Sequence, residues 1–133
     1  MLKSMPVELQ FEEPSLFIMR ASGAVTYEEV RRALDELLAD SRLRAGAAIF
    51  IDNRGVSSTP SIAEVAVITR QFGKVFARGR RRVALLTDSE LVYRVSQVFA
   101  SFASTVGADA KVFRDLQKAR EWLTESSSKP TSS

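Results

Sequence analysis

The sequence predicts an α/β domain with a five-stranded, mostly parallel sheet, an N-terminal antiparallel hairpin and helices on its faces. Short apolar runs alternate with longer amphipathic segments from residue 26 onwards, and such alternation requires a mostly parallel sheet. Before that point, two short strand-like runs flank the turn at residues 12–15, a pattern typical of a hairpin. The expected order is β-β-α-β-α-β-α-β-α, in one domain over residues 1–125.

The expected strands differ in how far they are covered. Residues 7–11 alternate apolar and polar side chains, as an edge strand does, and residues 16–21 complete the hairpin. Residues 47–51 are almost continuously apolar, which indicates a strand buried on both faces. Residues 83–86 and 111–113 supply the last two strands.

Capping residues mark the start of four helices. A Ser or Thr followed three residues later by Glu satisfies two free backbone amides, and this pattern begins at Thr26 and at Ser61. A lone Asp also caps helices, so we expect the third and fourth helices to begin after Asp88 and Asp115. The polar residues 126–133 are predicted to be a disordered tail.

The middle helices carry wide apolar faces. We expect the core stripe of the third helix to be formed by Leu91, Val95, Val98, Phe102 and Val106. Val92 and Phe99 lie partly off that stripe. Two interpretations remain open: burial on two sides within the monomer, or a surface for a second copy or an apolar ligand. The candidates for that surface are Phe72, Phe76, Phe99 and Phe102.

Composition excludes much chemistry. The 133 residues include no cysteine and no histidine, which excludes disulfides, thiolate zinc sites, cysteine nucleophiles and imidazole-based catalysis. We therefore expect no enzyme activity, no metal and no cofactor. No apolar run approaches the roughly 20 residues of a membrane span, and a cytoplasmic location is the natural interpretation.

The net charge of +3 is unevenly distributed, with −3 up to Thr69 and +6 from Arg70 onwards. Much of the excess lies in residues 78–82, where four arginines surround one glycine. Such a run can bind nucleic acid or an anionic membrane. Since no aromatic residues interleave with it, we favour a solvated turn paired with nearby acids, and expect no nucleic-acid partner.

These features together resemble the SpoIIAA-like proteins, of the wider STAS and CRAL-TRIO-like architecture, over about residues 5–124. The resemblance rests on the order of several short motifs: the opening hairpin, Gly23, Thr26-Tyr27-Glu28-Glu29, Ile51-Asp52-Asn53-Arg54-Gly55, Arg82-Val83-Ala84-Leu85-Leu86, and Val112-Phe113-Arg114-Asp115 with Ala119, Trp122 and Leu123.

The resemblance implies a function through protein contacts. STAS-type anti-sigma-factor antagonists bind a kinase-like anti-sigma factor, and are switched by phosphorylation of a serine in an Asp-Ser-Ser-Gly-like stretch at a helix start. That stretch is absent here, although Ser57, Ser58 and Ser61 occupy the comparable region. The CRAL-TRIO relatives, in contrast, imply an apolar or lipid-like ligand.

The candidate binding residues follow the strand at residues 47–51 and its neighbour. Asp52 and Arg54 suit either a polar ligand or a mutual ion pair, and Ser61 suits either a phosphate or a helix cap. The other candidates are Ser57, Ser58, Thr87 and Asp88. We expect the segments around residues 22, 52 and 87 to meet at one edge of the sheet.

The sequence therefore favours a non-enzymatic regulatory module of the SpoIIAA-like type that binds a protein partner. The sequence leaves open whether the chain also forms a homodimer. The alternative is a protein that binds a small apolar or lipid-like ligand between the helices.

Overall fold

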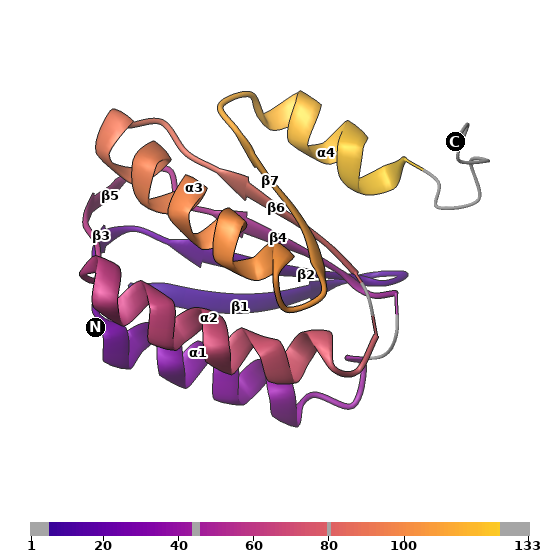
Figure 1. The fold of residues 1–133 in the computed structure, drawn as a ribbon. Helices are drawn as coiled ribbons and strands as arrows, with labels where there is room; N and C mark the ends of the chain where they lie inside the picture. The colour runs from indigo at the N-terminus through magenta and orange to yellow at the C-terminus, as the bar shows by residue number, and fades with distance from the viewer. Residues whose placement is uncertain (1–5, 44–45, 80, 126–133) are drawn as a thin grey trace, which may run out of the picture.

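A five-stranded sheet is the centre of the computed structural model, which describes residues 6–43, 46–79 and 81–125 (Figure 1). In spatial order its strands are β1 (Val7–Glu12), β2 (Leu16–Ala21), β4 (Ala48–Asp52), β6 (Arg81–Leu86) and β7 (Ala108–Phe113). The β1–β2 pair is antiparallel, and the other three pairs are parallel. The predicted fold class is thus confirmed. The predicted polar tail, residues 126–133, lies outside the described residues.

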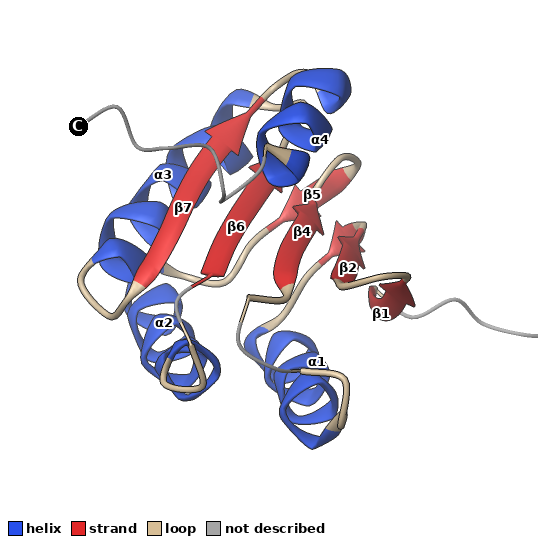
Figure 2. Cartoon of the chain, turned by 90° about the vertical axis from the view of Figure 1, so that its right-hand side faces the viewer, coloured by secondary structure: helices blue, strands red, loops and turns tan. Residues whose placement is uncertain are grey.

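Helices cover the two faces unequally. The helices are α1 (Tyr27–Ala39), α2 (Ile62–Phe76), α3 (Glu90–Ser104) and α4 (Leu116–Thr124). Successive parallel strands are added in one direction across the sheet, so right-handed crossovers place the first three helices on one face. Figure 2 shows these three on one side of the sheet and α4 on the other.

Local capping explains where the helices begin. Thr26 accepts a hydrogen bond from the Glu29 amide, and Asp115 accepts one from the Lys118 amide. The predicted cap of the third helix is wrong by one residue. Ser89, whose backbone is extended, accepts the amide of Val92 at 3.1 Å, and Asp88 is left free for another contact.

The buried face of α3 also differs from the prediction. Its buried residues are Val92, Ser96, Phe99, Ala100 and Ala103. Leu91 and Val106, which were expected in the core, are 57% and 37% exposed. Small side chains let this helix approach the sheet closely. A stripe predicted from the large apolar residues alone is therefore rotated about the helix axis relative to the face that is buried.

Two apolar clusters hold the layers together. The larger lies between the sheet and α1, α2 and α3, and includes Phe17, Leu34, Ile49, Phe72 and Val83. The smaller lies under α4, where Ala119 packs on Ile18 and Phe50. Burial at about 25 cal/mol per Å² of apolar surface makes the first cluster the main source of stability.

Candidate functional site

A second, two-stranded sheet anchors the segment that follows β4. Strands β3 (Gly23–Ala24) and β5 (Val56–Ser58) pair in parallel at the end of the molecule where α2 and α3 begin (Figure 1). The Gly23 amide donates to the Gly55 carbonyl at 2.9 Å, and the Val25 amide donates to the Ser58 carbonyl at 3.0 Å. Strands this short carry no periodic signal, which is why the sequence did not predict them.

Asp52, at the end of β4, forms the ion pair that the sequence suggested. Its carboxylate accepts the Arg54 amide at 3.1 Å and the guanidinium Nε and Nη2 at 3.0 and 2.8 Å. Burial of Asp52 disfavours the charged form, but the bonds from Arg54 and the charges of Arg54 and Arg20 outweigh it. The pKa of Asp52 therefore lies below its ordinary value. A carboxylate held in this way is a weak base, which does not suit general base catalysis at neutral pH.

The end of β6 completes this edge of the sheet. Asp88 is exposed and accepts the Gly55 amide at 3.4 Å, and the Asn53 amide donates to the Leu86 carbonyl at 2.8 Å. Thr87 is buried and bonds to the backbone of Ser89. The segments around residues 22, 52 and 87 thus meet, as predicted. We call the surface of residues 52–61 and the first residues of α2 and α3 the rim.

The three candidate serines have different environments. Ser61 caps α2 in a complete capping box: the Ser61 hydroxyl accepts the Glu64 amide at 3.2 Å, and the Glu64 carboxylate accepts the Ser61 amide at 2.9 Å. Ser57 and Ser58 are exposed on β5. The structural role of Ser61 is therefore clear, and the binding roles of the serines stay predictions.

Two large apolar residues on the rim are exposed. Ile62, at the start of α2, is 51% exposed, and Leu91, at the start of α3, is 57% exposed. Leu91 was assigned to a core stripe by its helical spacing. Both residues lie in the first turn of their helices.

An apolar cavity of about 100 Å³ lies behind the rim, between the sheet and the helices α1, α2 and α3. Phe72 and Phe99 line it, and Phe76 and Phe102 do not. Phe72, Phe76 and Phe99 are 2%, 4% and 6% exposed and Phe102 is partly buried, so they belong to the core of the monomer. Ordinary ligand pockets begin at roughly 300 Å³, so this cavity is smaller than those pockets.

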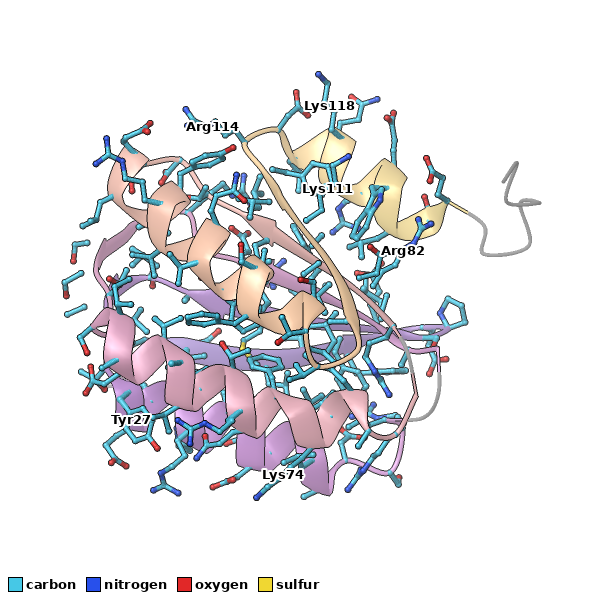
Figure 3. The ribbon with its side chains drawn as sticks, in the orientation of Figure 1. Tyr27, Lys74, Arg82, Lys111, Arg114 and Lys118 are labelled. Atoms are coloured by element: carbon cyan, nitrogen blue, oxygen red, sulfur yellow. The ribbon has the colours of Figure 1, made fainter. Side chains whose placement is uncertain are left out.

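The described arginines of residues 78–82, namely Arg78, Arg81 and Arg82, do not share one contact region. Arg78 donates to the Leu38 carbonyl at 3.0 Å, and Arg81, 3% exposed, donates to the Ala47 carbonyl at 3.1 Å. Arg82 lies beside α4 (Figure 3), where it donates to the Trp122 carbonyl at 2.6 Å and lies 3.4 Å from the Glu125 carboxylate. The three described arginines thus contact three different segments; Arg80 is outside the described residues.

Within the described ranges, no three Asp, Glu, His or Cys side chains gather as a metal ion requires. None of the helices described there is both long and apolar enough to cross a membrane.

The family of the chain follows from comparison with known proteins. The SpoIIAA-like family model matches residues 16–124, and the chain belongs to this family. No curated protein matches the chain significantly.

Solved structures share the fold. An uncharacterized protein of the DUF3478 family from Shewanella loihica PV-4, with a SpoIIAA-like fold, has a TM-score of 0.59 and 21% identity, and the match covers 92% of this chain and 98% of that one. The unphosphorylated anti-sigma factor antagonist SpoIIAA has a TM-score of 0.55 and 16% identity, and the match covers 90% of this chain and 97% of that one. The phosphorylated form of SpoIIAA, the Bacillus cell fate determinant, has a TM-score of 0.53 and 16% identity, and the match covers 88% of this chain and 98% of that one.

Proposed function

We propose that this protein is a non-enzymatic regulatory module of the cytoplasm that binds another protein through the rim. The single observation that carries the proposal is the exposure of Ile62 and Leu91 beside an anchored polar segment. Large apolar side chains surrounded by polar groups are typical of protein interfaces, where the centre is apolar and the periphery is polar.

The shape of this edge supports a protein partner over a small substrate. In open α/β sheets, substrates bind in the crevice where the strand order reverses. The order β1-β2-β4-β6-β7 never reverses, and β3 and β5 extend across the edge. What remains at this edge is an open hollow of about 580 Å³ beside Asp52 and Arg54, and a surface so open to solvent suits another macromolecule.

The polar part of the rim is held in a fixed conformation before any partner arrives. Asp52 binds Arg54, Gly55 is bonded to both Gly23 and Asp88, and Ser61 caps α2. A preorganised surface loses little conformational entropy on binding.

The family membership supports a regulatory role. SpoIIAA is an anti-sigma factor antagonist whose structure is known in unphosphorylated and phosphorylated forms. In this chain Ser57 and Ser58 are the exposed hydroxyls of the rim that are not used to cap a helix. We infer that modification of either serine would add charge at the proposed interface and weaken an apolar contact there.

Affinity capture from native lysate with quantitative mass spectrometry tests the proposal. Ile62→Ser with Leu91→Ser removes two exposed apolar side chains and should cost little stability, because neither is buried. The matched control is Leu116→Ser on α4, where the replaced leucine is 37% exposed on the other face of the sheet. We expect at least one protein to be retained by the wild type and the control and lost at least tenfold from the double variant.

Equal recovery by all three proteins would rule out the rim as the interface. A second capture with Ser57→Asp and Ser58→Asp should give the same loss if the serines face the partner. Sedimentation of the purified chain separates a homodimer from a different partner: a dimer that the double variant dissociates would assign the rim to a second copy.

A further inference from the structure

The main sheet ends on one side at β7, which pairs with β6 alone within the described part of the chain (Figure 2). The Phe113 carbonyl accepts the Thr87 amide at 3.0 Å, so every second residue counted back from Phe113 directs its backbone groups toward β6. The backbone groups of the other three residues of β7 are directed away from the sheet, at Ala108, Ala110 and Val112.

The edge of β7 is suited to receive another strand. Outward backbone groups along a regular edge strand are a template for strand pairing. The strand contains no proline, its register with β6 has no shift, and α4 packs more on β6 than on β7. On the face under α3, Ala110 and Val112 are only partly buried against the core. The edge thus offers backbone groups and apolar side chains together.

The exposed side chains of β7 carry opposite charges two residues apart. Asp109 and Lys111 lie on the face of the sheet that α4 partly covers (Figure 3). The Asp109 side chain is half exposed, and its nearest cation is Arg82 at 3.7 Å. With a second β7 antiparallel to the first and Ala110 opposite Ala110, Asp109 of each copy lies opposite Lys111 of the other. Opposite charges in such cross-strand pairs attract.

Charge also disfavours the neighbouring registers. A shift that places Ala108 opposite Ala110 brings Asp109 opposite Asp109. A shift that places Ala110 opposite Val112 brings Lys111 opposite Lys111. Like charges directly opposite each other are destabilising. The central register is therefore selected, and it has the twofold symmetry of a closed dimer.

The other edge strand, β1, lacks this self-complementarity. Its exposed charged residues, Glu8 and Glu12, are both acidic. In addition, the Arg32 side chain donates to the Val7 carbonyl of this edge at 2.6 Å. Two copies paired through β1 would therefore gain no attraction between opposite charges.

We propose that β7 is the interface of a homodimer, in which the sheets of two copies join antiparallel through their β7 strands. The pair Asp109–Lys111 then forms twice, once on either side of a twofold axis at Ala110. Because the two strands run in opposite directions, the rims of the two copies lie at opposite ends of the joined sheet. The dimer does not use the rim and does not depend on the rim binding a protein.

Sedimentation of the full chain over a range of concentrations tests the interface by charge reversal. We expect the wild type to be a dimer. Asp109→Lys places lysine opposite Lys111, and Lys111→Asp places aspartate opposite Asp109. Each variant alone should raise the dimer Kd at least about tenfold, because two attractive pairs become repulsive. Glu8→Lys is the matched control, since it makes the same charge change as Asp109→Lys on the other edge strand and should leave the dimer intact.

Mixing Asp109→Lys with Lys111→Asp should restore association, because every cross-strand pair between the two different chains again joins opposite charges. A wild type that stays monomeric at about 1 mM would overturn the proposal, since even a weak dimer is populated there. A dimer that neither reversal weakens would overturn it, as would a mixture that does not associate. A dimer that Ile62→Ser with Leu91→Ser dissociates would place the interface at the rim instead.

Should a charge variant fail to fold, disulfide cross-linking decides. The chain has no cysteine of its own. Ala110→Cys places two thiols opposite each other, with Cα atoms about 5.5 Å apart, as a disulfide requires. Val112→Cys is the control, because residue 112 lies opposite residue 108 of the second copy. We expect a cross-linked dimer of the first variant alone, and the same result for both variants would overturn the register.

Discussion

At the scale of single residues, Asp52 has two structural roles. It ends a buried strand, and it fixes the turn that follows by accepting three hydrogen bonds from Arg54. Its side chain is 7% exposed, whereas that of Arg54 is 47% exposed. Solvent thus screens the pair on one side only, and the interaction is stronger than an ordinary surface ion pair.

Replacement of Asp52 by Asn should destabilise the chain by about 1–2 kcal/mol at neutral pH. The amide keeps the shape of the carboxylate but turns an NH₂ group toward the Arg54 donors and loses the charge. Urea unfolding of the two proteins measures the difference. The control is Asp35→Asn on α1, an exposed partner of Arg31 at 3.2 Å, which should change stability by less than about 0.5 kcal/mol. Equal effects of the two replacements would contradict the buried role of Asp52.

At the scale of elements, two glycines have opposite roles. Gly55 turns the chain between β4 and β5 with a φ of +84°, in the left-handed region that other residues avoid. Gly73 lies inside α2, and a Cβ there would lie 4.0 Å from the Cβ of Val106, which is an ordinary contact. Backbone conformation rather than available space therefore distinguishes them.

Alanine at these two positions should change stability in opposite directions. Gly55→Ala should destabilise the chain by about 1–2 kcal/mol, because a left-handed conformation costs that much for an L residue. Gly73→Ala should stabilise it by about 0.5–1 kcal/mol, because alanine loses less backbone entropy in a helix. Thermal and urea unfolding of both variants measure the two signs. A stabilising effect of Gly55→Ala would show that the turn does not need its left-handed residue.

At the scale of the whole molecule, several carboxylates are tied to arginines and control stability in acid. The Arg42 side chain, together with its amide, lowers the pKa of Asp40 to about 2, and the pKa of Asp52 is also lowered. In the unfolded chain both groups take up protons near pH 4. As the pH falls below about 4, the unfolded state therefore binds protons that the folded state does not.

The free energy of unfolding should accordingly stay constant from pH 7 to about pH 5 and decrease between about pH 4 and pH 2. Urea unfolding across this range measures the slope. Asp40→Asn, which cannot titrate at this position, should show a shallower decrease than the wild type. A parallel decrease in both proteins would mean that Asp40 does not contribute to the acid sensitivity.

Local patterns predict much of this protein because they act over a few residues. The capping box at Ser61, the apolar strand after residue 47, and the order of the helices and of the strands of the main sheet are all confirmed. The meeting of Asp52 and Asp88 at one edge also follows from the sequence, because consecutive parallel strands end at the same edge.

Contacts between distant segments determine what the sequence leaves open. Ser96 and Ala103 are buried on the inner face of α3, whereas Leu91 and Ile62, in the first turns of α3 and α2, stay exposed. Arg81 and Arg82 follow each other in the chain, yet one is buried near Ala47 and the other contacts α4. The sequence by itself determined the order of the helices and of the strands of the main sheet, and the edge at which the segments around residues 52 and 87 meet. Only the tertiary structure decided which apolar side chains face solvent and where the core leaves a cavity, because both depend on how close the layers pack.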